Sequence, residues 1–174
     1  MKRERKLVRN VFIISIILFI FYYFGGYYLS NKACVEDIIR GLYVEEKDII
    51  MELRHNNEFQ TLVADLEKGT YSIIGTRKIG FLYRTSDCST HQTIKRDSAV
   101  HVYYGYSSNI GLYYYVYRNN KAVDKVEVEL YNGIKFTLDE WHQDFAGIIV
   151  DTDGWSGVYR AYDVNGNLIE ENQR

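Results

Sequence analysis

Two pairs of acidic residues near the end of the chain have the side chains that acid and base catalysis requires. Asp139 and Glu140 stand just before one tryptophan, and Asp151 and Asp153 stand shortly before another. Two carboxylates beside an aromatic ring can act as acid and base on a sugar when they lie about 5 to 10 Å apart. Asp139 and Glu140 are therefore candidate catalytic residues of a cell-envelope hydrolase.

The same acids have two further interpretations. Asp151 and Asp153 could contribute to a calcium site, because Ca²⁺ takes about six to eight oxygen ligands. The loop lacks the further spaced acids and the final glutamate of an EF-hand, so we expect no metal. Acids between strands also occur as solvated turn residues without chemical function.

Cys88 precedes His91 in a polar segment, and a thiol near an imidazole can serve as a nucleophile. No residue pattern supplies an oxyanion hole. The chain also contains no GxSxG, HExxH, Walker, GxGxxG or CxxC motif. The sequence thus favours a non-catalytic protein, and we expect no cofactor.

The chain has two cysteines, Cys34 and Cys88. Outside the cytoplasm they could form a disulfide, closing a loop of about 55 residues and contributing on the order of 2 to 4 kcal/mol. Two unpaired thiols are equally compatible with this spacing.

Tyrosine is unusually frequent, with 17 residues in the chain. Strand alternation sends Tyr113, Tyr115 and Tyr117 to one face and Tyr114 to the other, with Tyr103 opposite the first three on the neighbouring strand. An exposed row of this kind is a binding surface, because tyrosine combines a rigid apolar ring with a hydroxyl. A buried row is ordinary core.

An uncharged, apolar segment runs from Val11 to Leu29. A helix of about twenty such residues crosses a hydrocarbon core of about 30 Å. Tyrosines at its distal end suit a membrane interface, and basic residues precede it. We therefore predict a cytoplasmic tail over 1–10, a transmembrane helix over 11–29 and an extracytoplasmic domain over 30–174.

A cleaved signal peptide is the competing interpretation of this segment. The apolar run is longer than a signal requires, and Gly25-Gly26 is flanked by bulky aromatic residues. Cys34 lacks the small and apolar preceding residues of a lipidation site. These features favour a retained anchor in the cell membrane.

Charge is distributed unevenly along the chain. The first ten residues hold one acidic and five basic side chains, which gives +4, and the whole chain carries −2, so the remainder carries −6. A nucleic-acid partner needs a basic folded surface. The acidic outer part therefore excludes that class, and a cell-envelope protein or polymer is the expected partner.

The outer domain divides into two patterns. From residue 34 to 68 apolar residues recur at helical spacing, with Asn57 as an N-cap and Gly69 as a stop, which predicts two or three short helices. From residue 70 to 171 the period is two, with hairpin turns at Asn132-Gly133 and Asn165–Asn167. The fold class is therefore α+β, with a mainly antiparallel sheet.

This layout is similar to that of small surface proteins of low-GC Gram-positive bacteria, a resemblance of architecture that assigns no residue a role. We expect a non-catalytic interaction domain tethered to the membrane. The alternatives are the hydrolase above and a self-protection protein against a peptide toxin.

Overall fold

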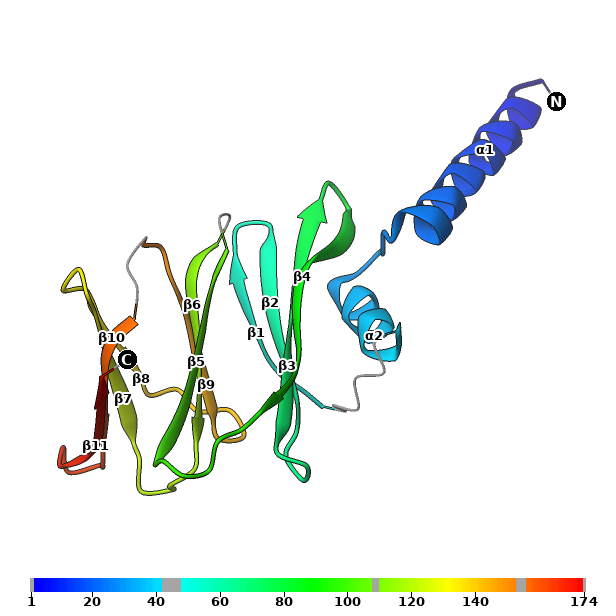
Figure 1. Cartoon of the computed structure of the whole chain (residues 1–174). Helices are drawn as coiled ribbons and strands as arrows, with labels where there is room; N and C mark the ends of the chain where they lie inside the picture. Colours follow the sequence, from blue (N-terminus) through cyan, green and yellow to red (C-terminus); the bar gives the residue numbers. More distant parts are fainter. Residues whose placement is uncertain (1, 42–47, 108–109, 153–155, 174) are drawn as a thin grey trace.

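The computed structural model describes residues 2–41, 48–107, 110–152 and 156–173 (Figure 1). These residues form two helices and eleven strands, and every strand pair is antiparallel. The helices are α1 (Lys2–Gly25) and α2 (Asn31–Gly41). The strands are β1 (Asp48–His55), β2 (Glu58–Asp65), β3 (Thr70–Ile79), β4 (Leu82–Thr93), β5 (Val100–Ser107), β6 (Gly111–Arg118), β7 (Lys125–Leu130), β8 (Lys135–Leu138), β9 (Phe145–Val150), β10 (Ser156–Tyr162) and β11 (Leu168–Gln173).

The strands form three sheets. Sheet A has the order β1-β2-β3-β4, sheet B the order β5-β6-β9, and sheet C the order β11-β10-β7-β8. The sheets stack face to face, with sheet B in the middle and α2 on the outer side of sheet A (Figure 1). Sheet C therefore lies at the end of the stack opposite the helices.

Strand β6 lies at the centre of this stack and is buried on both faces. Tyr113 and Tyr115 face sheet A, where they pack with Leu62 and Ile73. Tyr114 faces sheet C, among the valines of β5 and β7. The predicted division of these tyrosines between two faces is confirmed.

The predicted helices beyond residue 41 are wrong, because residues 48–65 form the β1–β2 hairpin. Strand β2 is buried between α2 and sheet B, so both of its faces carry apolar residues. Without an alternating wet face, its spacing resembles that of a helix. Asn57, the predicted N-cap, lies in the β1–β2 turn beside Asn56 at φ 54°, and Gly69, at φ 69°, lies in the β2–β3 turn, so neither is a helix boundary.

The remaining α+β pattern is confirmed. Helix α2 occupies the start of the predicted helical region, and the strands after residue 70 pair in antiparallel fashion, with hairpins at Asn132-Gly133 and Asn165–Asn167. Strand β9 pairs with β6, and β10 pairs with β7, across longer connections. The turn between β3 and β4 falls at Gly80-Phe81, and the polar segment around Cys88 belongs to β4.

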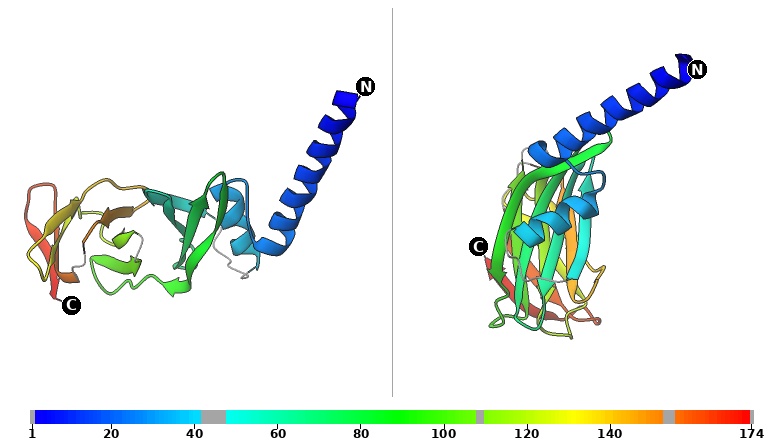
Figure 2. Two further views of the ribbon diagram at one scale, coloured as in Figure 1. Left: turned by 90° about the horizontal axis from the view of Figure 1, so that it is seen from above. Right: turned by 90° about the vertical axis from the view of Figure 1, so that its right-hand side faces the viewer.

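Helix α1 is long and apolar enough to cross a membrane, and none of the segment Arg5–Tyr23 is buried. It leaves the stack from the end occupied by sheet A and α2 (Figure 2). Except for Leu18, its large apolar side chains from Leu7 to Tyr23 are 43% to 70% exposed on every side of the helix.

Candidate functional site

The tyrosine row is core and not a binding surface. Tyr113 and Tyr115 retain 5% and 2% of their exposure, and Tyr117 and Tyr103 pack against the same cluster between sheets A and B. The Tyr115 hydroxyl donates a hydrogen bond of 2.8 Å to the backbone oxygen of Gln60. Sheet B lies between sheets A and C, so both faces of β6 are covered and, of the two interpretations of the row, the buried one applies.

The packing around Tyr113 depends on Gly105 of the neighbouring strand. A Cβ atom at position 105 would lie 2.3 Å from the Tyr113 hydroxyl oxygen, so only glycine leaves room for this ring. Burial, together with the nearby Tyr103 hydroxyl, raises the pKa of Tyr113. The phenol therefore remains neutral and contributes packing.

The two cysteines are not joined in a disulfide. Cys34 of α2 is buried, with its Sγ 3.9 Å from Thr85 Oγ1, and burial raises the pKa of its thiol. Cys88 is exposed on β4, and its partner Ile74 contacts α2, so both cysteines lie on the helix side of sheet A. Only Cys88 is therefore accessible to a reagent in water.

Asp139 and Glu140 line a cleft of about 280 Å³ formed by the end of β8 and the start of β9. Both side chains are exposed, as is Asp151, which does not line the cleft, and Asp153 lies outside the described residues. Within the described ranges, no group of three or more His, Cys, Asp or Glu side chains is placed to hold a metal ion. The cleft can receive a small polar ligand, and its two acids are solvated.

An ion-pair network fixes the connection between β8 and β9. Arg118 Nη2 lies 3.1 Å from Asp144 Oδ1, and Arg118 Cζ lies over the Trp141 ring, 4.6 Å from its centroid. Lys121 also pairs with Asp144. Burial alone would raise the pKa of Asp144, but the bonds from Lys121 and Arg118 outweigh it and the pKa is lowered. This network holds the backbone next to the cleft.

The outer face of sheet C carries charged side chains in pairs. Glu129 Oε2 accepts from Arg160 at 3.0 Å and from Lys135 at 3.2 Å, and Arg160 also reaches Glu171 at 3.4 Å. Arg160 and Lys135 lower the pKa of Glu129. The face includes Val158 and the polar or aromatic residues Lys125, Glu127, Glu129, Lys135, Thr137, Arg160, Tyr162 and Glu171, with Tyr131 at its margin.

The junction between α1 and the sheets, defined by Gly25–Leu29 and its contacts on β4, was not anticipated from sequence. Gly26, at φ 60°, turns the chain. Tyr27 folds back and packs edge-on against Phe21, with the two ring centroids 5.7 Å apart. Tyr28 then exchanges two backbone hydrogen bonds with Tyr83 of β4, at 2.7 and 2.8 Å.

The Tyr28 hydroxyl also donates to Asp37 Oδ2 of α2 at 2.5 Å. The end of α1 is therefore fixed to both sheet A and α2. The Gly25-Gly26 pair within aromatic residues was the available sequence signal, but the strand pairing of Tyr28 is a long-range contact that no local pattern predicts.

Comparison of the chain with protein-family models, with curated proteins and with solved structures finds no match.

Proposed function

We propose that the protein is a single-pass membrane protein that presents a non-catalytic binding domain outside the cytoplasm. The observation that carries this proposal is the exposure of apolar side chains all around α1. Exposed apolar surface costs roughly 25 cal/mol per Å² in water, and a patch of this extent marks contact with another phase. A lipid bilayer removes that cost along the whole length of the helix.

The charges around α1 support a cytoplasmic N-terminus. Basic residues precede the apolar segment, and basic flanks remain on the cytoplasmic side of a membrane. The sheets follow the other end of the helix and belong outside. The Tyr28–Tyr83 pairing fixes the domain directly to the anchor, since no flexible linker separates them.

The outer face of sheet C is the surface that we assign to partner binding. It lies at the end of the stack farthest from α1, so the bilayer does not cover it (Figure 1). Its paired carboxylates and guanidinium, with Tyr131 and Tyr162 beside them, offer both polar and aromatic contacts to a protein or polymer of the envelope.

Photo-crosslinking tests this assignment in cells that produce the full chain. A photoreactive amino acid replaces exposed Tyr131 at the margin of this face, and the matched control carries it at Glu67, in the turn between β2 and β3. The proposal expects a discrete adduct from position 131 alone, reduced by Arg160→Glu. Equal adducts from both positions, or none from position 131, would remove this face from consideration.

The cleft beside Asp139 and Glu140 favours a second candidate, an envelope hydrolase. Both carboxylates line one concave polar surface, as catalysis on a sugar would need. Against it, both are solvated, and a general acid must be kept protonated by burial. Release of soluble fragments from cell wall by the full chain in detergent, lost in Asp139→Asn or Glu140→Gln, would favour this candidate over the first.

A further inference from the structure

The hairpin tip between β3 and β4, residues Ile79–Leu82, exposes large apolar side chains. Ile79 is 46% exposed and Phe81 is 65% exposed, on either side of Gly80 at φ +63°. Turns between strands are normally polar, since they project into water. Val164 in the β10–β11 turn is exposed as well, so exposure alone does not indicate what covers the tip, and the tip differs from that turn in its position beside α1.

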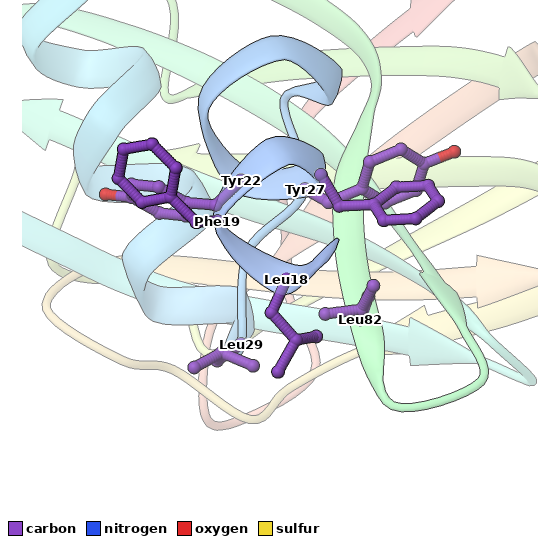
Figure 3. Close-up of a pocket in the computed structure, with 7 residues that line it drawn as sticks. Leu18, Phe19, Tyr22, Tyr27, Leu29 and Leu82 are labelled. Atoms are coloured by element: carbon purple, nitrogen blue, oxygen red, sulfur yellow. The ribbon is translucent and has the colours of Figure 1, made fainter. Parts of the chain in front are cut away.

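This tip lies beside the last turns of α1. Leu82 lines an apolar pocket of about 220 Å³ with Leu18 and Tyr22 of α1 and with Tyr27 and Leu29 of the junction (Figure 3). The right-hand view of Figure 2 shows the tip reaching alongside the helix. A membrane that surrounds α1 up to Tyr22 must therefore also reach the tip.

Cationic and aromatic side chains stand directly behind the tip. Lys78 Nζ lies 5.8 Å from the Tyr83 ring centroid, and Arg84 Cζ lies 5.6 Å from that of Tyr27. Behind the apolar tip, Lys78 and Tyr83 lie opposite each other and Arg84 follows. Aromatic and basic side chains next to an apolar tip match a membrane interface, where acyl chains give way to headgroups and phosphates. The charges thus complement a phospholipid surface.

We infer that the hairpin tip inserts into the interface on the outer side of the membrane, beside α1. We infer also that a phospholipid acyl chain fills the pocket between the tip and the helix. The inference rests on the proposed function, because α1 must first span the bilayer. A second point of insertion restrains rotation of the domain about the helix. It thereby fixes the direction in which the outer face of sheet C is presented.

The test uses the full chain reconstituted in phosphatidylcholine vesicles that contain phosphatidylglycerol. An environment-sensitive thiol dye is attached through Phe81→Cys in a Cys88→Ser background, which leaves only buried Cys34 as a native thiol. The matched control places the dye at Val164→Cys, another exposed apolar position, in the turn between β10 and β11. Flotation of the vesicles reports anchoring by α1 separately.

The inference expects the dye at position 81 to emit at shorter wavelength than the dye at 164. It also expects quenching at 81 by lipids with a nitroxide near the headgroup and quenching at 164 by aqueous iodide. Floating protein whose position 81 is quenched by iodide would overturn this inference and leave the anchor intact. A dye at 81 shielded from both quenchers would assign the tip to protein contact and would equally overturn it. Protein that fails to float would instead refute the proposed function.

Discussion

The β3–β4 hairpin tip beside α1 and the outer face of sheet C have different surfaces. Beside α1, the β3–β4 turn exposes Ile79 and Phe81, whereas the outer face of sheet C carries charged side chains such as Glu129 and Arg160 in ion pairs. Both ends are built from antiparallel hairpins, so the difference lies in what each surface meets. An apolar surface is stable where lipid covers it, and a charged surface is stable in water.

The largest effect should come from charges within the anchor. Ile13→Lys combined with Ile17→Lys places two cations within the apolar segment, at about 2.5 to 3.5 kcal/mol each. We expect the double variant to appear in the soluble fraction after alkaline extraction of membranes. The control, Val164→Lys with Leu168→Lys, alters exposed apolar residues at the far end and should stay in the membrane pellet. Identical fractionation of both variants would contradict the assigned difference between the ends.

A smaller effect is expected in the core that joins the ends. Leu62 is fully buried between sheets A and B, so Leu62→Ala should lower the free energy of unfolding by about 2 to 5 kcal/mol. Urea denaturation of the full chain in detergent micelles measures this change. Leu168→Ala, at an exposed position of sheet C, should alter it by less than about 0.5 kcal/mol. Comparable losses at both positions would mean that Leu168 is packed as tightly as Leu62, contrary to its exposure.

The Arg118–Asp144 network gives a pH-dependent effect. The pKa of Asp144 is lower in the folded chain, so its contribution is present above the ordinary aspartate pKa of about 3.9 and is lost as pH falls through the lowered value. Asp144→Asn should destabilise by about 1 to 2 kcal/mol near pH 6, and the difference should shrink at acid pH.

Urea midpoints of Asp144→Asn and of the unmodified chain, at pH 6 and at acid pH, measure this effect. The neighbouring neutral change Gln143→Asn should shift both midpoints equally. A loss of stability in Asp144→Asn that persisted at acid pH would show that the variant loses the hydrogen-bond geometry of Asp144 and not its charge.

The smallest effect is expected on the outer face of sheet C. Arg160→Ala removes the bonds to Glu129 and Glu171, but solvated ion pairs are screened by water and salt. Thermal denaturation should show a shift smaller than that of Asp144→Asn, and added salt should remove it. A large, salt-independent loss would mean that this face is part of the core and is not available to a partner.

The sequence predicted the region after residue 70 well, because alternation and Asn-Gly turns are local signals. It did not predict β2, whose two buried faces remove the alternation that distinguishes a strand from a helix. Alternation placed Tyr113 and Tyr115 on one face of β6, but whether that face is covered depends on sheet A, whose strands β1 and β2 were predicted as helices.

The candidate site shows the same limit. The cleft at Asp139 and Glu140 joins residues close in sequence. The sequence singled out these two acids, but it did not predict the cleft. The junction at Tyr28 and Tyr83 joins residues that are far apart in the chain, and a pairing of two strands over that separation leaves no local pattern.

Labelling of Cys88 in spheroplasts that produce the full chain tests most directly whether the sheets lie outside the cytoplasm. Cys88 is exposed and Cys34 is buried, so a membrane-impermeant maleimide reports on Cys88, with Cys88→Ser as the blank. An extracytoplasmic domain predicts full labelling before permeabilisation and none in the blank. Labelling of Cys88 only after the membrane is permeabilised would place the sheets in the cytoplasm and contradict the proposed topology.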